Sequence, residues 1–450
     1  MNARLKDPFT MAQLLLHVPE SSQPRQIGWL SQFGDNLRVS FAADYIEDPN
    51  RPTLSQLYTG ANDGETRAIL QAVNDERLVR IGKLPTFFSN LLPEGVNRER
   101  LAQQRGVTVE DELELLAAAG HDLTGGVEVV PADDVPKDVQ QLHATKNLEP
   151  IEPGTVAAPI DNGFSIDGIQ TKFSMVHDGR RYVIRHGTAA GDFIAKLPSP
   201  RFKDLVLNEG ICMRMAKAVG VNTANAEVRP IAELGVPDHV KEAFGEFLLV
   251  DRFDRFKRED GSTGRIHFEE LTQAIGLDAP KKYQDMEAAM RALLTTLKAS
   301  PKASADIDEF FRRWTVNALL GNPDAHSKNW GLIYLDGRRA QLSPAYDIVS
   351  VASYFDSAKA EELSMNRKID QTLRTWGEDT AAALAHQVDL YQVARIRRVV
   401  RETQRLAVAL WPAMLEEAPE RVRDTVRLRL KELVPAKVSK APATSRRAGP

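Results

Sequence analysis

Apolar and polar positions divide the chain into two blocks of strands and helices. In residues 12–60, short apolar runs such as "QLLLHV" and "NLRVSF" alternate with polar positions, which is typical of antiparallel strands. In the segment that follows, apolar positions recur at helical spacing, and Gly106 and Gly120 stand where helices should end. The first block therefore predicts an α+β domain over residues 12–130.

The second block begins after residues 131–160, whose Pro, Asp and Ala content without periodicity predicts a linker. Strand-like runs fill residues 161–255, with "HDGR" as a hairpin turn and one helix that Gly220 should close. From residue 256 to 433 the pattern is mostly helical, and the basic, acid-free tail 434–450 is predicted to be disordered. We therefore expect a strand-rich lobe followed by a large helical lobe.

Composition and charge narrow the class of protein. A chain of 450 residues that is 42% hydrophobic and 27% charged can bury the cores of two or three domains. The net charge of −4 argues against nucleic-acid binding by overall charge, so any basic patch must be local. The single cysteine, Cys212, excludes an internal disulfide and fits a reducing compartment. No apolar run approaches the ~20 residues that span a bilayer, and the N-terminus lacks a signal-peptide core, so we expect a soluble cytoplasmic protein.

The densest candidate chemistry lies in "NPDAHSKNWG", residues 322–331. Asp324 and Asn329 are five residues apart, the spacing at which protein kinases place a proton-accepting Asp and a Mg²⁺-binding Asn. Asp347 follows eighteen residues after Asn329, behind a predicted strand, where a metal-binding carboxylate would be needed. Two alternatives remain open for the loop: a polar turn, and a zinc site that uses Asp324 and His326.

Upstream residues supply further parts of a phosphoryl-transfer site. Lys196 lies in the apolar strand "FIAKLP", where an ammonium group needs a partner, and Glu209 in the following helix could reach it. Gly168 would let the backbone approach a phosphate, although the neighbouring Asp167 is unfavourable there. Each feature also has a structural explanation, namely a lysine at a strand end or a hairpin glycine. The order of glycine loop, lysine, glutamate, hinge, catalytic loop and metal Asp nevertheless matches that of kinases.

Taken together, these motifs resemble the HipA family of serine/threonine kinases, the toxins of type II toxin–antitoxin modules. The resemblance covers about residues 12–430 and rests on "SIDGIQTKFSM", "FIAKLP", "NEGICMRMAKAVGV", "LVDRFDR", "GNPDAHSKN" and "LSPAYDIVS", with "PTFFSNLLPEG" in the first block. It implies a two-lobed, protein-kinase-like α+β fold with an N-terminal α+β subdomain. It also implies ATP and Mg²⁺ as cofactors.

The resemblance assigns roles to individual residues. It implies that Asp324 is the proton acceptor and that Asn329 and Asp347 are Mg²⁺ ligands. Ser165 matches a loop serine that members of the family autophosphorylate. At the adenine hinge an aspartate replaces the expected glutamate, a change that backbone contacts should survive. The implied ATP site comprises Asp167, Gly168, Ile169, Gln170, Thr171, Lys172, Lys196, Glu209, Asp251, Arg252, Phe253, His326, Ser327, Lys328, Asn329, Tyr346 and Asp347.

Partners are implied in the same way. The family pairs with a HipB-like helix-turn-helix antitoxin on operator DNA, and its substrates are translation enzymes, notably glutamyl-tRNA synthetase. Arg398, Arg401 and Arg405 share one face of a predicted helix and are candidate DNA contacts, although such a stripe is also typical of a solvated face. Two other functions remain open: a small-molecule or lipid kinase with a similar loop, and a non-catalytic subunit that binds ATP or an antitoxin.

Overall fold

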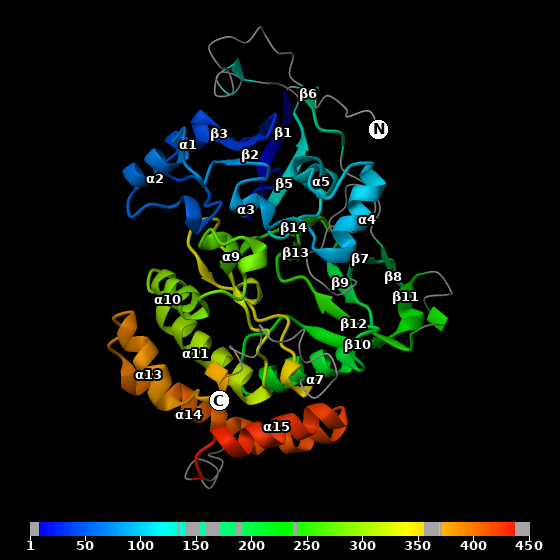
Figure 1. The fold of residues 1–450 in the computed structure, drawn as a ribbon, viewed down its shortest axis with the longest axis vertical. Helices are drawn as coiled ribbons and strands as arrows, with labels where there is room; N and C mark the ends of the chain where they lie inside the picture. Colours follow the sequence, from blue (N-terminus) through cyan, green and yellow to red (C-terminus); the bar gives the residue numbers. More distant parts are fainter. Residues whose placement is uncertain are drawn as a thin grey trace.

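In a computed structural model, an N-terminal α+β domain lies at one end of the long axis and a two-lobed α+β unit at the other (Figure 1). The structure describes residues 9–132, 154–158, 172–179, 181–184, 191–236, 244–354 and 371–436, with the isolated positions 136, 137, 139, 241, 242 and 369. The predictions for Ser165 and residues 167–171 lie outside these residues. So do most of the predicted linker and tail.

The N-terminal domain is built on an antiparallel sheet in the order β4-β3-β2-β1-β5, with β6 pairing in parallel with β1. The predicted succession of strands and then helices is confirmed. β6 lies within the predicted linker, so the chain returns to this sheet before it enters the second unit. The elements are β1 (Thr10–Leu16), β2 (Arg25–Phe33), β3 (Asn36–Phe41), α1 (Ala43–Glu47), α2 (Asp63–Leu70), β4 (Val79–Ile81), α3 (Thr86–Ser89), α4 (Gly95–Arg105), α5 (Glu112–Ala119), β5 (Val127–Pro131) and β6 (Gly154–Thr155).

Gly106 and Gly120 both follow helices, as predicted, but for different physical reasons. Gly106 ends α4 in the left-handed conformation, with φ at 74°, which glycine adopts without strain. Gly120 follows α5 with an ordinary helical φ of −43°. A Cβ atom at Gly120 would lie 1.9 Å from the carbonyl oxygen of Val129 in β5. Glycine is therefore required at position 120 because α5 packs closely against the sheet.

The N-lobe of the second unit is a sheet in the order β10-β12-β9-β7-β8-β11, with α7 packed against β10 and β12. The predicted "HDGR" hairpin is confirmed, because the Asp178 N–H donates to the Arg181 carbonyl over 3.1 Å. Gly220 follows α7 in the left-handed conformation. The elements are β7 (Lys172–His177), β8 (Tyr182–Ile184), β9 (Phe193–Lys196), α7 (Leu205–Ala218), β10 (Ala226–Pro230), β11 (Leu234–Gly235) and β12 (Glu246–Asp251).

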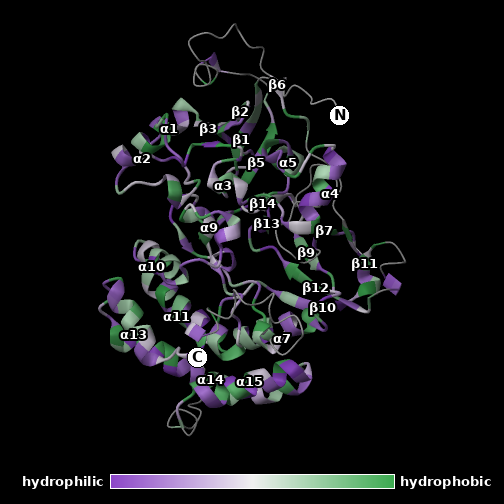
Figure 2. Cartoon of the chain, in the orientation of Figure 1, coloured by the Kyte–Doolittle hydropathy of each residue, from purple (hydrophilic) through white to green (hydrophobic). Residues whose placement is uncertain are grey.

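The C-lobe is mostly helical, as predicted, and the strands expected after the loop 322–331 are present as β16 and β17, which form a sheet in the order β15-β16-β17. Helices α13–α15 carry apolar and polar residues in alternation along their length (Figure 2), as expected for helices with one buried face. In the described part of the chain, no helix is long and apolar enough to cross a membrane. The elements are β13 (Arg255–Lys257), β14 (Thr263–Arg265), β15 (His267–Glu270), α9 (Leu271–Ala274), α10 (Met286–Leu297), α11 (Ala303–Leu320), β16 (Gly331–Tyr334), β17 (Gln341–Leu342), α13 (Glu378–Gln387), α14 (Val393–Met414) and α15 (Glu420–Leu433).

A buried carboxyl group joins the N-terminal domain to the C-lobe. Glu269 in β15 accepts hydrogen bonds from Ser55 Oγ at 2.5 Å, from the Gln56 N–H at 3.0 Å and from Tyr334 Oη at 2.5 Å. The Glu269 side chain is fully buried, and burial raises its pKa to about 7 in spite of these three donors. The contact between the two units therefore contains a group that titrates near neutral pH.

Replacing Glu269 with Gln should make the free energy of unfolding less dependent on pH. The folded pKa of about 7 lies above the ordinary value of 4.5. The stabilisation from the bound proton is therefore fully present below about pH 4.5 and is lost as pH rises through about 7. The difference between the two pKa values corresponds to about 3 kcal/mol.

Urea unfolding of the full chain at pH 5 and pH 8 measures this effect. The wild type should lose up to about 3 kcal/mol more than Glu269→Gln between these pH values. Glu76→Gln, a change at an exposed residue, should follow the wild type. Parallel pH profiles for wild type and Glu269→Gln would contradict the prediction.

Candidate active site

A buried lysine connects the N-lobe with the C-lobe. Lys196, the last residue of β9, donates to Glu209 Oε1 in α7 over 2.6 Å, as the sequence predicts. It also pairs with Asp347, which follows β17 in the C-lobe. Lys172 begins β7 directly opposite Lys196 in the sheet. Four segments from two lobes therefore bring their charges to one point.

The Lys196 and Asp347 charges in this cluster stabilise each other. Burial alone would lower the pKa of Lys196, but the carboxylates of Asp347 and Glu209 raise it above its ordinary value. Burial alone would raise the pKa of Asp347, but the charges of Lys196 and Lys172 hold it well below its ordinary value. Lys196 therefore stays protonated and Asp347 stays ionised at physiological pH.

Asp347 has a backbone conformation that non-glycine residues rarely adopt, with φ at 53°. Its carboxylate is 32% exposed, whereas the Lys196 side chain is 8% exposed. An ionised, accessible carboxylate held in a strained conformation fits the predicted role of a metal ligand. The role itself stays a prediction.

The predicted catalytic loop, residues 322–331, begins where α11 ends at Gly321, which adopts the left-handed conformation with φ at 65°. The Asn329 side chain folds back and donates its Nδ2 to the Asp324 carbonyl oxygen over 2.8 Å. The amide nitrogen makes this hydrogen bond, so Oδ1 is the Asn329 side-chain atom that is available to bind a cation. The donor set of Asn329 and Asp347 therefore fits Mg²⁺, which prefers oxygen ligands and is brought to such sites by ATP phosphates.

Tyr283, which the sequence did not single out, orients the proposed base. Its hydroxyl donates to Asp324 Oδ1 over 2.5 Å, and its ring meets the His326 ring edge-on at 4.8 Å between centroids. Burial lowers the pKa of His326 to about 4, so the imidazole is neutral at physiological pH. In the described part of the chain, no group of three His, Cys, Asp or Glu side chains could hold a metal ion, so the zinc alternative gains no support there.

Ser327 and Lys328, predicted near ATP, contact protein groups in this structure. Ser327 donates its Oγ to the Lys282 carbonyl oxygen over 2.9 Å. The Lys328 ammonium, on a side chain 5% exposed, lies 2.9 Å from Glu94 Oε1. Tyr346 donates its hydroxyl to the Lys328 carbonyl oxygen over 2.8 Å. Their contact with ATP stays a prediction.

At the predicted hinge, the Arg252 side chain contacts protein groups. It is 4% exposed and donates to Asp122 Oδ1 over 2.8 Å and to Asp254 over 3.0 Å. The expected contact of the hinge with adenine is through its backbone and stays a prediction. Asp122 belongs to the N-terminal domain, so this guanidinium group fixes that domain to the hinge. The N–H groups of Asp251 and Arg252 donate to the carbonyl oxygens of Asn225 and Asp192.

Phe253, the last residue of the predicted hinge, packs against the C-lobe. Its ring lies 5.1 Å from Phe268 in β15 and 5.8 Å from Tyr346, between ring centroids. Tyr346 also precedes Asp347 in the chain and contacts the catalytic loop. One aromatic cluster thus joins the predicted hinge, the segment that contains Asp347 and the loop 322–331.

The sequence missed three residues around the loop: Glu94, Lys282 and Tyr283. Glu94 lies in the motif "PTFFSNLLPEG", but no local pattern shows what these three residues contact, because each contact spans more than 40 residues of chain. The predicted DNA-contacting arginines lie on α14. Arg401 is paired with Glu378 at 2.5 Å and Arg405 with Glu402 at 2.7 Å, so the stripe presents less free charge than the sequence suggested.

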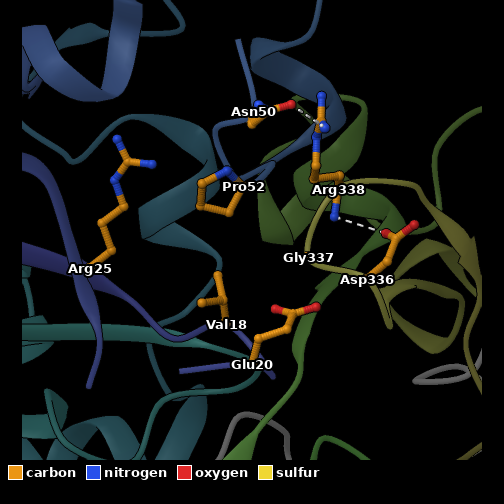
Figure 3. A pocket seen from close by; sticks show the side chains of 8 residues that line it. All are labelled: Val18, Glu20, Arg25, Asn50, Pro52, Asp336, Gly337 and Arg338. Atoms are coloured by element: carbon orange, nitrogen blue, oxygen red, sulfur yellow. Dashed lines mark hydrogen bonds between the residues drawn. The ribbon is translucent and has the colours of Figure 1, made fainter. Parts of the chain in front are cut away.

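A pocket of about 330 Å³ lies between the N-terminal domain and the hairpin of β16 and β17 (Figure 3). Arg338 spans part of it and donates to Asn50 Oδ1 over 2.8 Å. Its lining shares no residue with the Lys196 cluster or the catalytic loop. The lining residues are Val18, Glu20, Arg25, Asn50, Pro52, Asp336, Gly337 and Arg338.

Lys196→Met should destabilise the chain by about 3–5 kcal/mol, because it leaves the buried carboxylate of Glu209 without its cation. Adding Glu209→Gln should restore part of this loss, since the buried charge is then removed as well. Urea unfolding measures both variants, with Lys217→Met on the exposed side of α7 as the control. Equal stability of Lys196→Met and Lys217→Met would show that the cluster does not hold the lobes.

Comparison with known proteins places this geometry in a family. The HipA-like C-terminal domain model matches residues 164–411, and the HipA N-terminal domain model matches residues 21–130. A candidate kinase of Sinorhizobium fredii is 33% identical over 396 residues, which cover 86% of this chain and 89% of that protein. The serine/threonine-protein kinase toxin HipA of Shewanella oneidensis is 27% identical over 311 residues, or 64% of this chain and 68% of that protein.

A solved structure agrees with the fold. HipA in the Shewanella oneidensis complex with HipB and operator DNA superposes with a TM-score of 0.66 at 21% identity. The match covers 95% of this chain and 100% of that chain. The predicted two-lobed, kinase-like α+β fold with an N-terminal α+β subdomain is therefore confirmed. From the two family models and the relative at 33% identity, we conclude that the chain belongs to the HipA family of kinases.

Proposed function

We propose that the chain is an ATP-dependent serine/threonine protein kinase that acts as the toxin of a type II toxin–antitoxin module. The observation that carries this proposal is the cluster of Lys196, Glu209 and Asp347. Protein kinases pair a strand lysine with a helix glutamate to hold ATP phosphates, and they place a Mg²⁺-binding aspartate beside this pair. A polar turn at residues 322–329 would not require such a cluster.

Residues in and around the proposed catalytic loop have separate roles in phosphoryl transfer. Asp324 accepts the proton of the attacking serine or threonine hydroxyl as the bond from that oxygen to the γ-phosphorus forms and the bond to ADP breaks. Tyr283 and Asn329 hold Asp324 in place through its side chain and its carbonyl oxygen. Lys196 binds phosphates of ATP, either the γ-phosphate that is transferred or those that remain on ADP.

Asn329 and Asp347 would hold Mg²⁺ in this site. When bound, the metal neutralises the negative charge that develops on the phosphates. Asp347 is ionised and ready for this role, because Lys196 and Lys172 keep its pKa low. Lys196 would then be shared between Glu209 and the phosphates.

The resemblance to characterised family members supplies finer proposals. The protein substrate is a translation factor or an aminoacyl-tRNA synthetase, with glutamyl-tRNA synthetase as the first candidate. Autophosphorylation on Ser165 would add about −1.5 to −2 charges to the phosphate loop and switch the kinase off. The proposed partners are a HipB-like antitoxin and, through it, operator DNA, the molecules present in the Shewanella oneidensis complex.

Variants at the two key carboxylates should separate chemistry from ATP binding. Asp324→Ala should lower kcat by about 10²–10⁴-fold, because the base is lost, while ATP affinity is retained. Asp347→Ala should weaken Mg-ATP binding itself, because a metal ligand is lost. Titration with ATP in the presence of Mg²⁺ and transfer of radiolabelled phosphate into proteins of a cell extract measure the two effects.

The same variants test the toxin function in cells. Expression of the wild type should arrest growth and produce new phosphoserine or phosphothreonine sites, whereas Asp324→Ala should do neither. Glu76→Gln, an exposed change far from the loop, serves as the matched control. Phosphorylation of a small molecule or lipid without any protein phosphorylation would replace the proposal with the small-molecule kinase. Growth arrest by Asp324→Ala equal to the wild type would instead favour a non-catalytic role.

A further inference from the structure

One carboxylate of the N-terminal domain reaches the catalytic loop. Glu94 precedes the first residue of α4, yet its side chain does not cap that helix. Its Oε1 lies 2.9 Å from the Lys328 ammonium and its Oε2 lies 3.0 Å from the Lys282 ammonium. A side chain from residue 94 therefore bridges two lysines that lie about 190 and 230 residues away in the chain.

The bridge is charged and largely shielded from water. The exposed fractions of the three side chains are 22% for Glu94, 11% for Lys282 and 5% for Lys328. Burial alone would raise the pKa of Glu94, but the two ammonium groups lower it to about 2. Glu94 is therefore ionised throughout the physiological range. Surface ion pairs contribute little, but a shielded carboxylate with two cations holds its partners in one geometry.

Both lysines belong to segments that shape the site around Asp324. Lys328 lies between Ser327 and Asn329 in the catalytic loop. The Lys282 carbonyl oxygen accepts from the Ser327 N–H at 3.2 Å and from its Oγ at 2.9 Å. The residue after Lys282 is Tyr283, whose hydroxyl holds Asp324. Glu94 thus holds together two segments: the loop 322–331, through Lys328, and the segment 282–283 that contacts this loop, through Lys282.

We propose that Glu94 is a positioning residue for phosphoryl transfer, and that the N-terminal domain completes the active site through it. This inference rests on the proposed kinase function. Glu94 does not touch the reacting atoms; it acts through Lys328 and Lys282 on the placement of Asp324. Phosphate transfer then depends on the docked state of the N-terminal domain, because undocking withdraws the carboxylate that bridges the two lysines, although Lys328 keeps Glu270 of β15 at 3.5 Å.

Glu94→Gln keeps the shape of the side chain and removes its charge. It should lower kcat for phosphate transfer from ATP into proteins of a cell extract by about tenfold to a hundredfold, because small displacements of catalytic groups are costly. The Kd of ATP should stay unchanged. Glu94→Asp, which keeps the charge, should recover part of kcat. Glu99→Gln, on the exposed face of the same helix, should behave as the wild type.

Amide hydrogen exchange of residues 322–330 in the full chain gives a readout that does not depend on activity. Exchange in this loop should rise in Glu94→Gln and stay at the wild-type rate in Glu99→Gln. If the wild type transfers phosphate and Glu94→Gln has the same kcat, the inference is wrong and the proposed function stands. If the wild type transfers nothing, the proposed function fails, and unchanged exchange in Glu94→Gln overturns the positioning role independently.

Discussion

The ammonium group of Lys196 constrains the arrangement of the whole kinase unit. A charged lysine cannot stay buried at the end of β9 without counter-charges, so α7 must present Glu209 and the C-lobe must present Asp347 at the same point. These ion pairs fix the position of α7 relative to the N-lobe sheet that contains β9. They also fix the two lobes relative to each other, and the candidate ATP site lies where these segments meet.

The N-terminal domain is attached to the kinase unit largely through buried polar groups. Glu269 receives hydrogen bonds from both units, Arg252 binds Asp122, and Glu94 binds two lysines near the catalytic loop. Such contacts add little net stability compared with apolar packing, but each has only one geometry in which it is satisfied. They therefore specify how the domain docks, and that specificity links the domain to the chemistry.

Much of the fold follows from the sequence, because strand alternation, helical spacing and terminal glycines act locally. The residues of the Lys196–Glu209 pair and of the catalytic loop could be singled out for the same reason, since their spacing within neighbouring elements carries the signal. Arg252 and Glu94 could not be assigned this way. Their partners in the other unit lie about 130 residues or more away, and a hinge arginine or a glutamate before a helix has no local pattern that identifies such a distant partner.

The sequence alone determined the class of elements and the candidate groups for phosphoryl transfer, because those depend on residue type and short-range periodicity. Only the tertiary structure decided which charges pair across long distances in the chain. It brought Asp347 to Lys196, turned the Lys328 ammonium to Glu94 and placed the Tyr283 hydroxyl on Asp324. The physical reason is that a buried charge is stable only beside the partner that the whole fold delivers, however far away that partner lies in the chain.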